Sequence, residues 1–170
     1  ASNGISVIFT DSVEEISSIP FNGNGKINNI SIGKNVKEIA GGAFYNTQIY
    51  KDEANWEDGL FYYDGWLLDI NVSNTLYSCS IKEGTKVIAN SVFSGESSLR
   101  EITLPESLTK ICNSAFSGCS SLKEIILPKG VTAIGAGAFS GCKELTKIDI
   151  PEGVTAIANS TFNNCSLLSE

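Results

Sequence analysis

The 170-residue sequence is 42% hydrophobic and 18% charged, a composition typical of a folded globular domain rather than a disordered or fibrous chain. Nineteen acidic residues against twelve basic ones give a formal net charge of −7, which excludes nucleic acid and anionic membranes as favoured partners. The chain has no histidine and no long apolar stretch, so imidazole-dependent catalysis, histidine-zinc sites and a membrane-spanning helix are excluded as well.

The chain begins Ala1-Ser2-Asn3-Gly4 and contains no methionine. We therefore expect it to be part of a longer polypeptide from which a leader is absent. Its five cysteines include no CxxC pair, and an odd number fits neither a closed disulfide framework nor a standard zinc site.

A 23-residue period runs through the chain. Four phenylalanines keep this spacing, at Phe93, Phe116, Phe139 and Phe162, and three prolines and three cysteines share it. A repeat of about 20 to 50 residues is typical of a solenoid, in which stacked coils complete one another's core. We predict a β-rich solenoid of about seven 23-residue coils, one of them irregular, with units at 4–26, 27–49, 50–75, 76–98, 99–121, 122–144 and 145–167.

The first two units follow the repeat through their apolar positions. Ile30 and Phe44 have the phase of the core positions in the later units. The first unit has Thr10 where later units have proline, and Pro20 where they have alanine. These two departures leave the geometry of the first coil open.

The third unit is longer than the others and predicts a hairpin. Asp64-Gly65 separates two apolar runs, residues 60–63 and 66–68. An Asp-Gly pair favours a type I′ turn, because both central residues of that turn need a positive φ. The irregular coil is therefore expected to carry a β-hairpin.

Aromatic residues gather in this hairpin, residues 56–66. Trp56, Tyr62, Tyr63 and Trp66 are the candidates for exposure. Their rings either cover a gap that the irregular coil leaves, or form a platform for a sugar ring or a peptide. The second interpretation makes the hairpin a candidate glycan-binding site.

The later units are regular, and unit 122–144 shows the pattern most clearly. Ile125 and Leu127 alternate with outward residues, as in a short strand with one buried face. Pro128 ends that strand, and the β-branched run 131–134 predicts a second one. Phe139 then points into the core.

The cysteines follow the same phase. Cys119, Cys142 and Cys165 share one repeat position, whereas Cys79 and Cys112 replace inward apolar or small residues. Stacked equivalent residues are separated by about 4.8 Å, more than the roughly 3.8 Å between the Cβ atoms of a disulfide. We expect small core side chains rather than bridges or metal ligands.

The outward positions of the first strand in each unit form one row along the expected concave side. In the earlier units this row is neutral and short-chained, and in the later units it carries mixed charge. Such a row is either a solvated face or a partner-binding surface, which repeat arrays commonly have there. The candidate binding residues are Glu101, Thr103, Glu124, Ile126, Lys147 and Asp149.

The repeat pattern Leu-x-x-Ile-x-Ile/Leu-Pro-x-Gly-Val-Thr-x-Ile, followed by Ala-Phe-Ser-Gly-Cys, resembles the BspA-like leucine-rich repeats of bacterial surface proteins. The resemblance covers almost the whole chain, and the last three units match it nearly letter for letter. It implies a leucine-rich-repeat solenoid from a secreted or cell-surface protein of a bacterium.

The resemblance also implies a non-catalytic function. Some proteins of this kind are adhesins that bind host extracellular-matrix proteins, so a protein ligand is the first expectation. A glycan bound at the aromatic hairpin and a purely structural spacer are the alternatives. No motif in the sequence indicates a cofactor.

The C-terminal residues begin a further unit. Leu168 has the phase of Leu145 and Leu122, so the template expects a strand after it. An open coil end presents unpaired strand groups and apolar side chains. We expect either further repeats beyond this point or end-to-end self-association.

Overall fold

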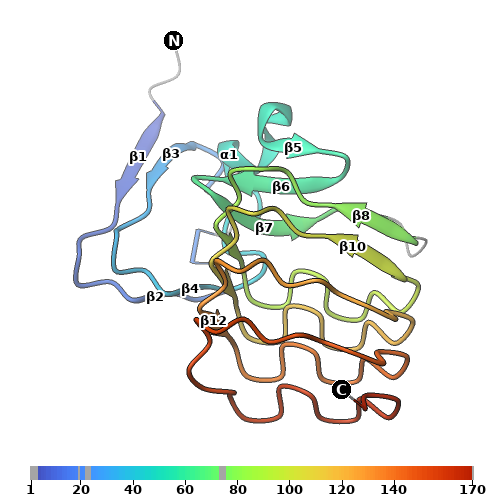
Figure 1. Ribbon diagram of the computed structural model, residues 1–170. Coiled ribbons are helices and arrows are strands. Elements are labelled where there is room, and N and C mark those ends of the chain that lie inside the picture. Colours follow the sequence, from blue (N-terminus) through green and yellow to red (C-terminus); the bar gives the residue numbers. More distant parts are fainter. Residues whose placement is uncertain (1–3, 19, 22–23, 73–75, 170) are drawn as a thin grey trace.

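The computed structural model, described here for residues 4–18, 20–21, 24–72 and 76–169, is a β-rich solenoid, as the sequence predicts (Figure 1). Its strands are short and its regular helix is limited to a single turn. The elements in chain order are β1 (Ile5–Ile8), β2 (Glu15–Ile16), β3 (Ile27–Ser31), β4 (Glu38–Ile39), α1 (Gln48–Lys51), the 3-10 helix η1 (Glu53–Asn55), β5 (Trp56–Glu57), β6 (Leu60–Tyr63), β7 (Trp66–Ile70), β8 (Ser78–Ser80), β9 (Val87–Ile88), β10 (Glu101–Thr103), β11 (Lys110–Ile111) and β12 (Ala133–Ile134).

The parallel strand pairs confirm the 23-residue period. Lys110 in β11 lies opposite Val87 in β9 on one side and Ala133 in β12 on the other, each 23 positions away. The pairs β8–β10 and β2–β4 keep the same offset. Because equivalent residues of successive coils lie side by side, each coil buries the apolar face of its neighbour.

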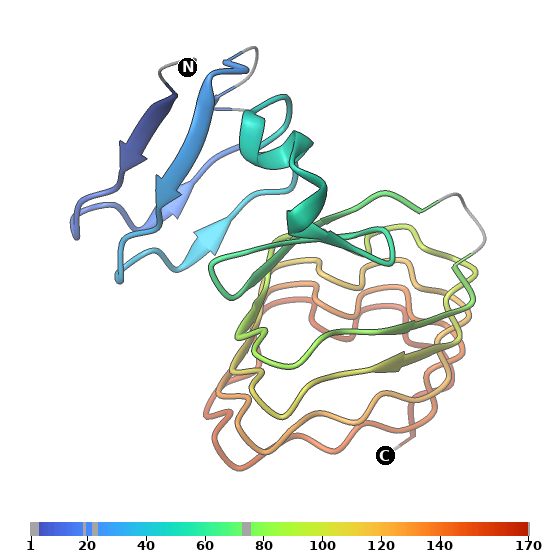
Figure 2. The same ribbon diagram turned by 90° about the horizontal axis from the view of Figure 1, so that it is seen from above.

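The number of coils is slightly lower than predicted, with about five turns at about 23-residue spacing instead of seven. The irregular unit contributes a helical turn and a hairpin in place of a plain coil. The first two coils, which carry β1 to β4, lie beside the hairpin and the later coils rather than in line with them (Figure 2).

The hairpin in the irregular unit forms where the sequence places it. Strands β6 and β7 pair antiparallel around Asp64 (φ 49°) and Gly65 (φ 78°), the two positive φ angles that a type I′ turn needs. A second tight turn at residues 58–59 adds the short strand β5, which the sequence analysis missed. Strand β7 then pairs parallel with β9, so the hairpin continues the solenoid sheet.

A column of stacked phenylalanines fills the core of the regular coils. The ring centroids of Phe93 and Phe116 are 5.1 Å apart, those of Phe116 and Phe139 are 5.5 Å apart, and Phe162 follows at 5.8 Å. The interplanar angles are only 4° to 6°, so the rings repeat by translation. This confirms the inward assignment of these positions.

Backbone hydrogen bonds join the coils alongside this column. The amide of Phe116 donates to the carbonyl of Ala138 at 2.8 Å, and the amide of Phe139 donates to the carbonyl of Thr161 at 2.9 Å. The same bond therefore recurs from coil to coil. Within the described residues, no helix is long and apolar enough to cross a membrane.

Candidate functional site

The outward side chains of one side of the solenoid form what we call the strand face. It consists of β8, β10 and the equivalent residues of the next two coils, 124–126 and 147–149. All six candidate residues of the later coils lie on it, and all are exposed: Glu101, Thr103, Glu124, Ile126, Lys147 and Asp149. A salt bridge of 3.5 Å joins Lys147 to Asp149, and both side chains are largely open to solvent.

A groove divides the strand face between β10 and residues 124–126. Its volume is about 950 Å³, within the range of about 300 to 1,000 Å³ that is usual for ligand sites. Its walls include Glu101, Thr103, Glu124 and Ile126, so the structure brings four of the six candidates together. A much smaller hollow of about 80 Å³ separates residues 124–126 from Lys147 and Asp149.

The groove exists because the hydrogen-bond ladder is interrupted on this face. Strands β8 and β10 make a two-stranded sheet, and within the described part of the chain the next coil adds only an isolated bridge between Glu124 and Lys147. The same coils remain joined elsewhere, since β11 pairs with β12 and the amide of Thr132 donates to the carbonyl of Thr109 at 2.9 Å. Among the described residues, units 99–121 and 122–144 therefore keep backbone bonds on the side of β11 and β12, whereas none joins β10 to residues 124–126.

Ile126 is the most exposed large apolar side chain among the described residues. Its exposed fraction is 77%, although its neighbours Ile125 and Leu127 are buried. It stands at the wall of the groove, with carboxylates close by at Glu124 and Glu101. Ile126 therefore adds an apolar side chain to an otherwise polar and charged part of the strand face.

The aromatic residues of the hairpin lie mostly inside the molecule. Trp66 and Tyr62 are buried, with exposed fractions of 7% and 6%. Trp56 is half-buried, and its indole Nε1 donates to the carbonyl of Tyr50 at 2.7 Å. Its ring also packs against Phe61, with centroids 5.2 Å apart. These contacts give the rings a structural role.

The tyrosine hydroxyls of the hairpin also bond within the protein. The Tyr62 hydroxyl accepts from the amide of Lys82, and its burial raises the pKa of Tyr62 to about 12. The Tyr63 hydroxyl accepts from the amide of Ile30 at 3.2 Å and lies 3.3 Å from Asn29 Oδ1. The hairpin thus joins the first coils to the later ones.

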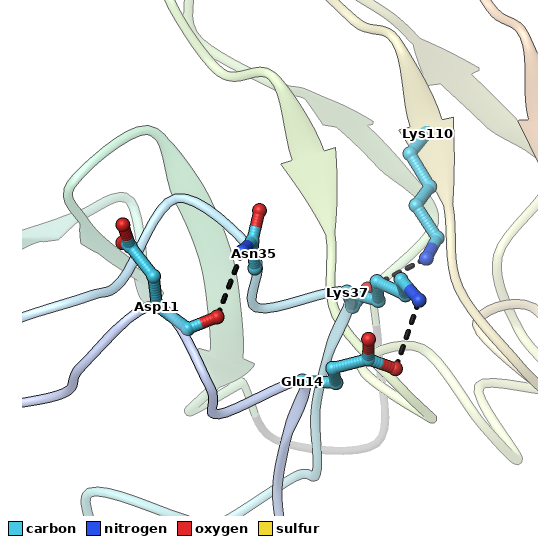
Figure 3. A network of polar contacts seen from close by, with 5 residues as sticks. All are labelled: Asp11, Glu14, Asn35, Lys37 and Lys110. Carbon is cyan, nitrogen blue, oxygen red and sulfur yellow. Dashed lines mark hydrogen bonds and ion pairs between the residues drawn. The ribbon is translucent and has the colours of Figure 1, made fainter.

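A polar junction between the first coils and the later ones was not predicted from the sequence. Figure 3 shows Lys37 between Glu14, whose carboxylate it contacts at 2.8 Å, and Lys110, whose ammonium donates to the Lys37 carbonyl at 2.6 Å. In the same network Asn35 donates to the carbonyl of Asp11.

The same junction also holds a carboxylate between two coils. The side chain of Glu38 accepts from Asn90 at 3.2 Å and from Asn113 at 2.9 Å. Nothing in the repeat pattern signals these contacts, because the partners are 52 and 75 residues apart rather than a multiple of 23.

The cysteines are free thiols packed into the coils. Cys119 donates to the carbonyl of Phe93 at 3.2 Å, and Cys142 and Cys165 make the equivalent bonds to Phe116 and Phe139. Burial raises the pKa of Cys142 to about 12, so its thiol is neutral at physiological pH and a poor nucleophile. Among the described residues, no three His, Cys, Asp or Glu side chains gather as metal ligands.

The fold resembles solved structures of bacterial leucine-rich repeat proteins. One from Eubacterium ventriosum is 21% identical, with a TM-score of 0.66; the match covers 98% of this chain and 47% of that one. A leucine-rich cell surface protein from Faecalibacterium prausnitzii is also 21% identical, with a TM-score of 0.56 and coverage of 96% and 58%. The chain thus spans about half the length of these relatives.

No curated protein matches this sequence. The family model described as the BspA type leucine rich repeat region matches residues 2–76 and 71–170, in six copies. Those residues cover nearly the whole sequence. The chain therefore belongs to the BspA type leucine-rich repeat family.

Proposed function

We propose that this chain is a non-catalytic protein-recognition module of a secreted or cell-surface protein, and that it binds host or matrix proteins in the manner of an adhesin. The observation that carries the proposal is the groove in the strand face, with Ile126 exposed on its wall. A relative with the same fold is described as a cell surface protein, which supports the location. Leucine-rich repeat proteins are typically non-catalytic, which supports a binding role.

The strand face suits a protein partner better than the hairpin suits a glycan. A sugar platform needs an open ring face, whereas Trp66 and Tyr62 are buried and Trp56 packs against Phe61. The groove, by contrast, combines one exposed apolar side chain with charged and hydroxyl groups around it, as the centre and rim of protein interfaces do.

The test measures binding of the purified chain to a panel of immobilised extracellular-matrix proteins and to a glycan array. We expect saturable binding to a matrix protein and at least tenfold weaker binding for Ile126→Asp. The matched control is Ile8→Asp, since Ile8 is a 73% exposed isoleucine on β1, away from the groove. This control is expected to bind like the unchanged chain.

Three outcomes would contradict the proposal. If Ile126→Asp binds the matrix protein as tightly as the unchanged chain does, the binding surface lies outside the groove. If the chain binds only glycans, and Trp56→Ala abolishes that binding, the hairpin is the binding site. Failure to bind any protein or glycan would favour the structural spacer. Circular dichroism spectra of each variant verify that the fold is retained.

A further inference from the structure

The groove leaves one edge of β10 without a strand partner. Strand β8 pairs with the other edge, in the register Glu101 to Ser78 and Thr103 to Ser80. Among the described residues, no hydrogen bond joins β10 to residues 124–126 across the groove. An unpaired strand edge is a template for another strand.

The backbone groups of Ile102 face the groove. The amide of Glu101 donates to the carbonyl of Tyr77, and the carbonyl of Thr103 accepts from the amide of Ile81, so both residues direct their groups towards β8. Hydrogen-bonding groups alternate between the two sides of a strand. The N–H and C=O of Ile102 therefore point away from β8, into the groove.

We propose that the groove binds an extended peptide segment of a protein partner, which inserts as an additional strand between β10 and residues 124–126. This inference rests on the proposed function and names the chemistry of its ligand. Strand addition supplies main-chain hydrogen bonds for affinity, and alternate side chains supply specificity. Pairing with the free edge of β10 would satisfy the N–H and C=O of Ile102 together with backbone groups of the added strand.

The side chains along the groove define which peptide fits. Glu124 is 23 positions after Glu101 and Ile126 is 23 positions after Thr103, the offset of the paired strands elsewhere. An inserted strand therefore places one outward residue between the two glutamates and the next outward residue, two positions on, between Thr103 and Ile126. Cross-strand pairs favour opposite charges and β-branched apolar neighbours. The preferred pattern is a basic residue, any residue, then valine or isoleucine.

Basic residues also line the groove, and they restrict the preference for a basic peptide residue to one position along the peptide. The Arg100 guanidinium lies 5.5 Å from the ring centroid of Tyr77, on the β8 side. Lys123 and Lys129 precede and follow the outward pair of their coil, Glu124 and Ile126. Among the described residues that line the groove, only Glu101 and Glu124 form a pair of carboxylates at equivalent positions, since the equivalent of Glu106 is Lys129.

The first experiment titrates the chain with seven-residue peptides that are acetylated and amidated at their ends. The test peptide has lysine at its third position, valine at its fifth and threonine elsewhere. We expect saturable binding below millimolar concentration and at least tenfold slower exchange of the Ile102 amide. A peptide with glutamate in place of lysine, and one N-methylated at its fourth and fifth backbone nitrogens, should each bind at least tenfold more weakly.

The second experiment reverses the charge of the protein. The double variant Glu101→Lys, Glu124→Lys should prefer the glutamate peptide over the lysine peptide. The matched control is Glu15→Lys, an exposed glutamate in β2 away from the groove, which should leave the preference unchanged. Since both groove glutamates are exposed, the fold should tolerate their replacement.

The outcomes separate this proposal from the proposed function. Equal binding of the N-methylated peptide, or no binding of the lysine peptide at millimolar concentration, would overturn strand insertion. If matrix-protein binding nevertheless depends on Ile126, the surface is a recognition site of another kind. If the peptides bind with all the predicted preferences but no matrix protein binds, the groove is a peptide-binding site and the adhesin-like role is wrong.

Discussion

Replacing one ring of the phenylalanine column tests the physical basis of the solenoid. Phe116 is fully buried and lies between Phe93, at 5.1 Å, and Phe139, at 5.5 Å, with interplanar angles of 4° on both sides. Truncation of a buried phenylalanine to alanine costs about 3–5 kcal/mol. Each stacked pair adds about 0.5–1.5 kcal/mol, so Phe116→Ala should cost the upper part of that range, about 4–5 kcal/mol.

Guanidinium denaturation followed by circular dichroism measures this loss, and a thermal scan should show a Tm lower by about 8–20 °C. Phe162→Ala is the matched control, because Phe162 is half-buried and stacks on Phe139 at the longer distance of 5.8 Å. Its cost should be about half as large. A loss below about 1 kcal/mol for Phe116→Ala, or equal losses for both variants, would refute the reasoning.

Three further variants test other parts of the fold. Burial raises the pKa of Cys112 and Cys142 from 9.0 to about 12, so between these pH values the native state retains thiol protons that the unfolded state releases. The free energy of unfolding should therefore fall as the pH rises from 9 to 12. Replacement of both cysteines by alanine should make that fall smaller, as measured by urea titrations. Tyr63→Phe removes the bond to the Ile30 amide and should cost about 1 kcal/mol, with faster exchange of that amide as the readout. In Gly135→Ala the new Cβ would lie 2.5 Å from the amide nitrogen of Asn113, so the free energy of unfolding should fall by about 1–3 kcal/mol. The control is Gly41→Ala, whose new Cβ would have its nearest contact at 3.4 Å and should change the melting temperature little.

The solenoid could be predicted from periodicity because its core is made of contacts between equivalent residues. A buried ring in one coil packs on the equivalent residue of the next coil, so the 23-residue spacing of Phe93, Phe116 and Phe139 reports the fold directly. The hairpin could be predicted from local turn chemistry at Asp64-Gly65. Both signals lie within one or two units of the sequence.

The groove and the junction of the first coils could not be predicted in the same way. Glu101 and Glu124 occupy equivalent positions, and a uniform repeat predicts pairing that the structure does not show between their segments. The bonds from Asn90 and Asn113 to Glu38 join residues at unequal spacings through polar groups, which carry no periodic signal. The repeat phase therefore predicts that residues such as Ile126 point outward, but it does not predict the groove between β10 and residues 124–126.

The recurring bonds between coils have a consequence for how proteins of this architecture vary in length. The amide of Phe116 meets the carbonyl of Ala138 in the way that the amide of Phe139 meets that of Thr161. A duplicated 23-residue segment inserted between residues 144 and 145 would offer the same acceptors to the coil before it and the same donors to the coil after it. Each such copy would lengthen the solenoid by about 4.8 Å without changes in the neighbouring coils. Duplication or deletion of single repeats can therefore change the length of the solenoid one coil at a time.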